Sequence, residues 1–478
     1  MPRQRKLDVP QFGAKLSWCF DNLVPQRIVP STRGEAKASR SGLQEISNYS
    51  NLWMRMRHEP DADVPIRERW LQDVRENHCS APILELICRI YPELEIELLV
   101  DTDFDTFCRR AKPLVTARDR YVELGRHFLR ERVALAAFSK AHYRDVDETP
   151  DWPLIGRKSW RLDQPVPLSE TSALDRFAPS ASFPPAVPLP GLNARYSQIR
   201  RMLAPGSILP FNGDCYRLIE IDMNREGRPC FIYGPCCYFE YYDTCEVHAL
   251  KMAALHRGEA GPPAPDILDL AGKASVPGVN TLTVFRNFKP EGSRQGDYFL
   301  LHRRSSKTVQ AGNTVHVVPS GQHQPSQAHY GRDEDVSIWR TMVREFCEEI
   351  YGLPEAHGLR TDPGDQLDSP AFRKIVDPIF RRGAARSYLL GAGLDPVTAK
   401  AEILVVTVID FALIDRAGAD RLRELKPNFE GDVRFFALSE TQIRTQLDLD
   451  RSGDLKWLPA GKACLQEFLR HYQAVMSV

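Results

Sequence analysis

Apolar residues recur at a helical spacing in the first third of the chain. Phe12, Leu16 and Phe20 follow one another every four residues, and Tyr121–Phe138 mixes apolar and charged residues at a similar period. Side chains spaced in this way lie on one face of a helix, which can then pack against a core. The pattern therefore predicts a helical region over residues 1–148.

Two segments that are unfavourable for regular structure follow this region. Residues 149–195 are crowded with proline, and the run that includes Pro184, Pro185 and Pro188 can form neither a helix nor a central strand. We expect a linker there, or an extended arm that lies across another domain. Residues 258–278 are also rich in proline and glycine and predict a second linker.

The stretch between these two segments alternates strand-forming runs with turn residues. Cys215–Ile221 and Arg228–Tyr233 flank a turn-like segment, which predicts a β-hairpin. A helix should follow over Thr244–His256, with Thr244 as its N-terminal cap. Residues 196–257 are therefore expected to form a small α+β module.

From residue 279 to residue 478 the pattern mixes strand and helix periods. Strands are expected at Thr281–Arg286, Tyr298–His302, Thr314–Val318, Glu402–Ile409 and Val433–Leu438, and helices at Ser337–Tyr351, Thr441–Leu447 and Ala463–Val475. This order predicts a layered α/β or α+β sandwich. The fold class that follows is an α+β multidomain protein, in which a helical N-terminal region and a small α+β middle module precede the sandwich.

The composition limits the partners that the chain can have. It contains 478 residues, 42% of them hydrophobic, and its 63 basic residues balance its 63 acidic ones. A net charge of zero argues against general attraction to nucleic acid or membranes, although a local patch is compatible with it. The sequence has neither an apolar run long enough to span a membrane nor the apolar segment of a signal peptide. We therefore expect a cytoplasmic protein of several domains.

Eleven cysteines show no paired framework, which is typical of a reducing compartment. Five of them form a cluster near His248, namely Cys215, Cys230, Cys236, Cys237 and Cys245. Structural zinc sites normally present closely spaced pairs of ligands, and this cluster has none at the usual spacing. Buried thiols are therefore favoured over a metal site.

The helix expected over residues 337–351 has an apolar face and an acidic face. The apolar face consists of Trp339, Met342, Val343, Phe346 and Ile350. Glu345, Glu348 and Glu349 are spaced so that their carboxylates share another face, where like charges repel. A hard divalent cation such as Mg²⁺ removes that repulsion and leaves sites for phosphate oxygens. A solvated acidic face has the same pattern, so the residues before the helix are needed to decide between a metal site and an ordinary surface.

A glycine loop precedes this helix. Val315–Val318 is expected to be a strand that runs into Pro319-Ser320-Gly321, a tight loop whose backbone amides can approach a ligand. The helix contains the run Arg344-Glu345-Phe346-Cys347-Glu348-Glu349-Ile350-Tyr351-Gly352. This combination resembles the box of the Nudix family, and the resemblance covers the chain from Val279 to Val478. The resemblance implies that this domain is a Nudix-like α/β/α sandwich.

The resemblance implies a role for each residue of the box. Glu348 and Glu349 would ligate Mg²⁺ or Mn²⁺, and Glu345 would be a further ligand or the base that activates water. Arg344 precedes Glu348 by one helical turn and would orient the carboxylates through an ion pair. Gly321 would shape the loop against the substrate.

Three residues outside the box have two interpretations each. Arg303 and Arg304 follow an expected strand, and they would meet phosphate or form an ordinary surface pair. Glu430 precedes another strand, and it is a late acidic partner or, more simply, a surface residue.

The chain also departs from the family's pattern. The stretch from Gly321 to Arg344 is longer than in the usual box, and one extra residue precedes the final glycine. Val336 stands where the box has an acidic residue, although Glu334 and Asp335 are adjacent in the sequence. These departures keep the three glutamates and leave turnover as an open question.

The first sixty residues have a local excess of positive charge, with ten Lys or Arg against five Asp or Glu. Within them Ser41–His58 resembles the two helices of a repressor-type helix-turn-helix, with Arg55 and Arg57 on the second helix. In such motifs the second helix enters the major groove of DNA. A helical bundle with a basic surface explains the same residues, so DNA binding is one of two interpretations.

Two functions from different classes follow. The first is a Nudix-like hydrolase that uses Mg²⁺ or Mn²⁺ to bind and cleave a nucleoside diphosphate linked to another moiety. The second is a nucleotide-sensing transcriptional regulator without turnover, whose N-terminal region binds DNA. Both place a nucleotide or nucleoside diphosphate derivative at the acidic helix. Neither involves a membrane, and both are compatible with a homo-oligomer.

Overall fold

The chain divides into two compact units. The first consists of Met1–Leu124 and Val187–Pro205, and the second of Gly125–Ala186 and Gly206–Val478. The computed structural model describes residues 6–22, 78–80, 84, 87–88, 94, 96–181, 187–203, 212–290, 292–304, 314–325, 336–354, 366–414, 431–448 and 456–477. The acidic helix lies in the second unit. The prediction of a tight loop before it is wrong for Ser320 and Gly321, because both belong to a short strand, Ser320–Gln322, whose backbone pairs with residues 278–280.

In its described residues the first unit is mainly helical. Its elements are β1 (Lys6–Asp8), α1 (Phe12–Asn22), β2 (His78–Ser80), α5 (Ile96–Val100), most of α6 (Phe104–Arg130), α8 (Tyr196–Ile199) and η3 (Arg200–Leu203). Phe12 and Leu16 of α1 are fully buried, as their four-residue spacing predicts. Lys15, next to them, is buried too and donates hydrogen bonds to the carbonyls of Leu99 and Thr102. The helix α1 is thereby tied to α5 and the turn that follows it.

A nine-stranded mixed sheet forms the centre of the second unit. Its strands are β3 (Arg161–Leu168), β7 (Gly278–Phe288), β8 (Gly296–Arg304), β9 (Thr314–Val317), β10 (Ser320–Gln322), β11 (Ala385–Leu394), β12 (Ala401–Asp410), β13 (Gly431–Ala437) and β14 (Lys456–Trp457). The order is β14-β9-β8-β7-β12-β11-β3, with β10 also paired to β7 and β13 to β8. The five predicted strands are confirmed. The pattern does not predict β11, because Gly391 and Gly393 weaken its strand signal.

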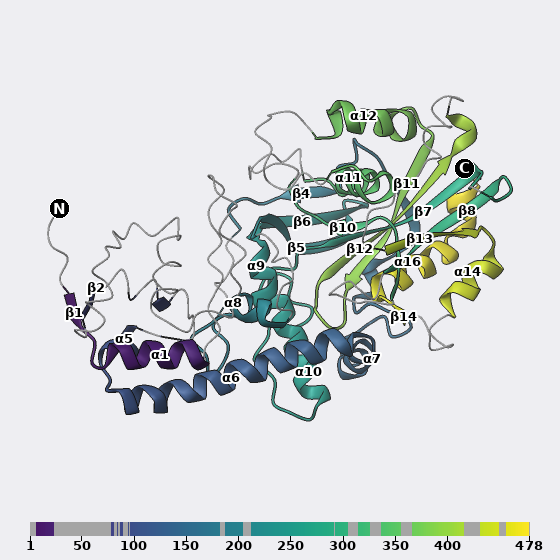
Figure 1. The fold of residues 1–478 in the computed structure, drawn as a ribbon. Helices are drawn as coiled ribbons and strands as arrows, with labels where there is room; N and C mark the ends of the chain where they lie inside the picture. The colour runs from purple at the N-terminus through teal and green to yellow at the C-terminus, as the bar shows by residue number, and fades with distance from the viewer. Residues whose placement is uncertain are drawn as a thin grey trace. The chain divides into compact units, whose positions relative to one another are not determined.

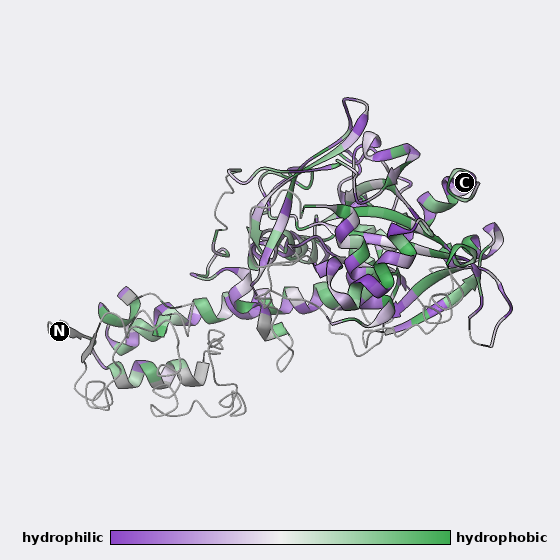
Figure 2. Ribbon diagram, turned by 90° about the horizontal axis from the view of Figure 1, so that it is seen from above, coloured by the Kyte–Doolittle hydropathy of each residue, from purple (hydrophilic) through white to green (hydrophobic). Residues whose placement is uncertain are grey.

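Helices cover both faces of this sheet (Figure 1), so the predicted layering is confirmed. α11 (Ile338–Tyr351) and α12 (Pro370–Val376) pack on one face, and α14 (Glu440–Leu447) and α16 (Pro459–Arg470) pack on the other. Figure 2 shows that helices around the sheet carry both hydrophilic and hydrophobic residues, as expected for helices with one face toward a core. The shorter helices of this region are η6 (Gln366–Asp368), η7 (Asp377–Arg381), η8 (Phe411–Leu413) and α17 (Tyr472–Met476). None of the helices in the described ranges is long and apolar enough to cross a membrane.

A smaller sheet contains the predicted hairpin. Its strands are β4 (Asp175–Phe177), β5 (Asp214–Arg225) and β6 (Arg228–Cys237), in the order β4-β6-β5. β5 and β6 turn at Glu226 and Gly227, which have φ angles of 54° and 80°. Positive φ at both central residues is the conformation that tight hairpins favour. The hairpin prediction is therefore confirmed.

The helix after the hairpin begins earlier than expected. α9 (Tyr238–Tyr241), the π-helical η4 (Tyr242–Glu246) and α10 (Val247–His256) follow one another without a break. Thr244 is inside this segment, where its hydroxyl donates to the Glu240 carbonyl and accepts the Ala274 amide. The prediction of a Thr244 cap is wrong, because the Glu240 carboxylate already accepts the Cys237 amide at the true start of the helix.

The two proline-rich segments contribute to the second unit. β3 lies within residues 149–195 and follows α7 (Arg132–His142) and η2 (Lys158–Trp160). It is an edge strand of the large sheet, a position in which proline is tolerated. Within residues 258–278, the carbonyl of Ser275 accepts the amide of Leu218 from β5.

Candidate functional site

The acidic helix α11 begins and ends where its sequence signals place it. The Ser337 hydroxyl accepts the Arg340 amide at 3.3 Å, and Gly352 follows the helix with a φ of 63°. Its apolar stripe is buried in the core that lies on this face of the sheet: Trp339, Met342, Val343, Phe346 and Ile350. The glutamates therefore lie on other sides of the helix, one of which faces β10.

A carboxylate from β4 holds the start of α11. The amide of Ile338, the first residue of the helix, donates to Asp175 at 2.9 Å, and the Tyr233 hydroxyl donates to the same carboxyl group at 2.9 Å. Burial raises the pKa of Asp175 to about 7, against the effect of both hydrogen bonds. Sequence reasoning misses this contact, because Asp175 lies in a different segment of the chain from the helix that it caps.

Arg344 joins the helix to the segment that leaves β10. Its guanidinium donates to the carbonyls of Gln324 at 3.1 Å and Gln322 at 3.2 Å, and to the Glu345 carboxylate at 3.0 Å. The Arg344 side chain is only 7% exposed, so these hydrogen bonds are shielded from water. The ion pair described here joins Arg344 to the neighbouring Glu345, whereas helical spacing alone suggests Glu348.

Gly321 lies directly against Glu345. A Cβ atom built on Gly321 would be 1.9 Å from Cδ of Glu345, closer than any real side chain can approach. Glycine is therefore required for the Glu345 carboxyl group to reach the β10 backbone. The structure thus brings Gly321, Arg344 and Glu345 together, although 23 positions of sequence separate Gly321 from Arg344.

The other two glutamates have different partners. Glu349 accepts the backbone amide of Ser320 at 3.2 Å, so Glu345 and Glu349 reach adjacent residues of β10. Glu348 is buried, and it accepts a hydrogen bond from the Gln366 side chain of η6 at 3.1 Å. The acidic face is thus divided, with two carboxylates at β10 and one toward η6.

Glu345 and Glu349 suit an oxygen-preferring cation. Mg²⁺ is commonly held by one or two protein carboxylates, with phosphate oxygens and water as its other ligands. Among the described residues, no group of three or more His, Cys, Asp or Glu side chains is placed to hold a metal ion by itself. Glu345 and Glu349 are thus the two carboxylates beside β10 that could contribute to such a site.

His323 is buried next to this site and was not identified from the sequence. Its ring lies 5.0 Å from the ring of Tyr216 and 4.8 Å from that of Tyr233, and Nδ1 is 2.7 Å from the Thr341 hydroxyl. Burial, and secondarily the charge of Arg344, lower the pKa of His323 to about 3. The imidazole is therefore neutral near pH 7 and fixes the segment after β10 through Thr341.

The remaining candidate residues lie elsewhere. Arg303 is on β8, where its register partners are Asp432 of β13 and Val315 of β9. Arg304 ends the same strand. Five other candidates lie outside the described residues, namely Arg55, Arg57, Glu334, Asp335 and Glu430. The predicted helix-turn-helix at Ser41–His58 also lies outside them.

The cysteine cluster consists largely of buried thiols. Cys215 and Cys236 oppose each other across the hairpin, and Cys230 and Cys245 are buried as well. Burial raises the pKa of Cys215 to about 12 and that of Cys245 to about 11. These thiols are protonated near pH 7 and act as small apolar side chains.

Similar chains are found among solved structures but not among family models or curated sequences. No family model matches this chain, and no curated protein matches its sequence. Nine chains of solved structures are similar to it. One is described as "Crystal structure of NUDIX hydrolase from Alicyclobacillus acidocaldarius", with 15% sequence identity over 42% of this chain and 96% of that one, and a TM-score of 0.25.

Proposed function

We propose that the α11–β10 site binds a divalent cation together with a nucleoside diphosphate derivative and hydrolyses it, as a Nudix-type hydrolase does. The main support is the approach of Glu345 and Glu349, from one helix, to adjacent residues of β10. Gly321 makes that approach sterically feasible, and Arg344 joins the helix to the segment that follows β10. Two neighbouring carboxylates beside the half-buried strand β10 match the donor set that a phosphate-bound cation requires.

Each residue has a defined part in this proposal. Mg²⁺ or Mn²⁺ held by Glu345 and Glu349 would neutralise charge on the diphosphate. Glu348 lies toward η6, where Gln366 donates to it, so it would reach the cation only by giving up that hydrogen bond. Arg344 orients Glu345, whose carboxylate is the candidate acceptor for a proton from the attacking water.

A second function also has an observation in its favour. Each of the three glutamates already accepts a hydrogen bond from a protein donor, respectively Arg344, Gln366 and the Ser320 amide. A cation would have to compete with these donors, which favours a domain that binds a nucleotide without cleaving it. In that case the protein would act as a nucleotide-sensing regulator, with Arg55 and Arg57 as candidate DNA contacts.

Product formation separates the two functions. Full-length protein would be incubated with nucleoside diphosphate sugars, dinucleotides and nucleoside triphosphates, with Mg²⁺ or Mn²⁺ and with a chelator. Hydrolysis predicts metal-dependent products that fall about a hundredfold in Glu349→Gln, since loss of even an indirect metal contact costs 10- to 100-fold. Glu440→Gln, an exposed acidic residue in the first turn of α14, is the matched control and should behave as wild type.

The alternative outcomes are equally distinct. Binding of a nucleotide by calorimetry without any product would favour the regulator. That function further predicts DNA binding that weakens steeply with salt and is lost in a variant with Arg55→Ala and Arg57→Ala. If wild type neither binds nor cleaves any member of the panel, both functions are wrong.

A further inference from the structure

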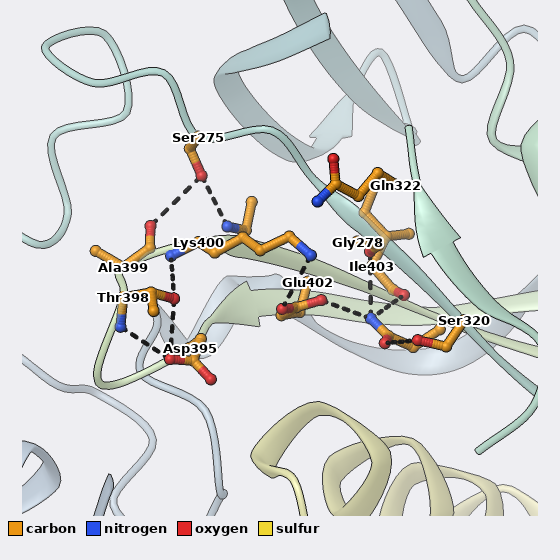
Figure 3. Close-up of polar contacts among 12 residues, drawn as sticks. Ser275, Gly278, Ser320, Gln322, Asp395, Thr398, Ala399, Lys400, Glu402 and Ile403 are labelled. Carbon is orange, nitrogen blue, oxygen red and sulfur yellow. Dashed lines mark hydrogen bonds and ion pairs between the residues drawn. The ribbon is translucent and has the colours of Figure 1, made fainter. Parts of the chain in front are cut away.

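Glu402 lies on the face of the sheet opposite to α11. Successive residues of a strand point to opposite faces, and the next residue of β12, Ile403, belongs to the core that contains α11. Leu404, which is on the same side of β12 as Glu402, packs in the core of α16. The Glu402 carboxyl group is buried there and lies 3.7 Å from the Lys400 ammonium. Figure 3 draws this ion pair.

A second glycine makes room for this carboxyl group. A Cβ atom on Gly278 of β7 would be 2.1 Å from Oε2 of Glu402. Gly278 pairs with Gln322 of β10, and the next residue of β7, Val279, pairs with Gly321. The same end of the β7–β10 ladder therefore has two glycine recesses, one for Glu345 on the α11 face and one for Glu402 on the α16 face.

Asn280 connects Glu402 to β10, and its amide can be assigned in one orientation only. Nδ2 lies 2.8 Å from the Glu402 carboxylate and also within 3.4 Å of the carbonyls of Gly278 and Ile403, all of them acceptors. Oδ1 is thus left to accept the Ser320 hydroxyl at 3.3 Å. The Ser320 side chain is therefore oriented by Glu402 through the amide of Asn280.

Ser320 completes the connection through the sheet. Its hydroxyl is bound on the α16 face, while its backbone amide donates to Glu349 on the α11 face at 3.2 Å. We infer that Glu402 is a positioning residue for the α11 site, because the chain of hydrogen bonds through Asn280 and Ser320 fixes the amide that holds Glu349. The inference rests on the proposed function, since it concerns the same carboxylates.

Four variants of the full-length protein test this inference. Ser320→Ala breaks the link to Asn280 but keeps the backbone amide, whereas Ser320→Thr retains the hydroxyl. Glu402→Gln keeps an acceptor for Asn280 but removes the charge, and a hydrogen bond to a charged group is about twice as strong as one between neutral groups, so this variant weakens the link between Glu402 and Asn280. Ser387→Ala is the matched control, because it removes a buried hydroxyl that is hydrogen bonded to Thr407 within the same sheet.

Two measurements report on the site without turnover. Mn²⁺ affinity is measured by electron paramagnetic resonance, and amide hydrogen exchange is measured for the peptide that contains β10. One hydrogen bond contributes about 1 kcal/mol, which corresponds to about a fivefold change in an equilibrium constant. Ser320→Ala and Glu402→Gln should therefore weaken Mn²⁺ binding and accelerate β10 exchange by about fivefold. Ser320→Thr and Ser387→Ala should stay within about twofold of wild type.

The outcomes distinguish this inference from the proposed function. If wild type binds Mn²⁺ and Ser320→Ala matches Ser387→Ala in both measurements, Glu402 does not position the site, and the proposed function is unaffected. If wild type fails to bind Mn²⁺ in the presence of a diphosphate, the proposed metal site is wrong. Exchange of β10 then still decides the connection to Glu402, and equal rates in wild type and Glu402→Gln overturn it.

Discussion

Replacement of Arg344 tests whether one buried cation holds the candidate site together. Its guanidinium, in a side chain only 7% exposed, donates to the carbonyls of Gln322 and Gln324 and to the carboxylate of Glu345. Arg344→Met keeps much of the side-chain volume but removes the donor from all three acceptors. Removal of one partner of a buried ion pair costs about 3–5 kcal/mol, so we expect the free energy of unfolding to fall by that amount.

Two further variants provide losses of stability with which the loss in Arg344→Met can be compared. Arg344→Lys keeps the charge but lacks the planar group that reaches several acceptors at once, so the loss should be about 1.5–3 kcal/mol. Arg434→Met is the matched control, because its ion pair with Asp432 joins side chains that are 53% and 64% exposed, and its loss should cost about 0–1 kcal/mol. Urea denaturation monitored by tryptophan fluorescence measures all three, with Trp339 on α11 as a local probe. The reasoning is refuted if Arg344→Met costs no more than Arg434→Met.

Three other predictions concern the site and its supports. Gly321→Ala puts a methyl group 1.9 Å from Cδ of Glu345. Because Gly321 does not have a positive φ, the fold should persist, while the Mn²⁺ affinity measured by calorimetry should fall about tenfold or more. An unchanged affinity would contradict the close approach of Glu345 to Gly321. Burial lowers the pKa of His323 from 6.5 to about 3, so between about pH 3 and pH 6.5 the imidazole binds a proton only in the unfolded chain. The free energy of unfolding should therefore fall as the pH drops below 6.5, by up to about 1.4 kcal/mol per pH unit. Urea titrations at about pH 7 and about pH 5 measure this dependence of the free energy of unfolding on pH, which should be smaller in His323→Gln but unchanged in the exposed control His142→Gln. An equal pH dependence in wild type and His323→Gln would exclude His323 as the cause. Gly227→Ala, at a φ of 80° with no atom within 4 Å of the new Cβ, should cost about 1 kcal/mol by backbone strain alone, and an unchanged urea midpoint would argue against the positive φ.

Local rules were sufficient for several helices and strands, although not for β10 and β11. The helix α11 was predictable because its apolar residues repeat at helical spacing between a serine cap and a terminal glycine. β12 was predictable from a β-branched run, and the hairpin from two strand-forming segments around a turn. These signals depend on residues only a few positions apart, so they can be recognised in the sequence without knowledge of the tertiary contacts.

One local rule failed for an instructive reason. Threonine is a favourable N-terminal cap, but Thr244 is inside a helix that starts at Tyr238. The carboxylate of Glu240 accepts the Cys237 amide, which starts the helix earlier, and the Thr244 hydroxyl is used to bind the Ala274 amide from another segment. Both Glu240 and Thr244 have side chains that can accept a backbone amide at the start of a helix, and the sequence pattern does not show which of them does so.

The composition of the candidate site was visible in the sequence, whereas its connections were not. The spacing of Glu345, Glu348 and Glu349 follows from the helix, and so does their shared negative charge. Their different partners depend on where β10 and η6 lie against α11. The partners of Arg344 also depend on the position of β10. Its guanidinium donates to the carbonyls of Gln322 and Gln324 as well as to the neighbouring Glu345.

Contacts between distant parts of the chain were decided by the tertiary structure alone. Asp175 caps a helix that begins 163 residues later, and Asn280 meets Glu402 across 122 residues. The sequence determined which segments become helices and strands, because those choices depend on neighbouring residues. Which strands pair, in what register, and which carboxylate then meets which donor depend on packing the whole sheet, and no periodicity along the chain encodes that arrangement.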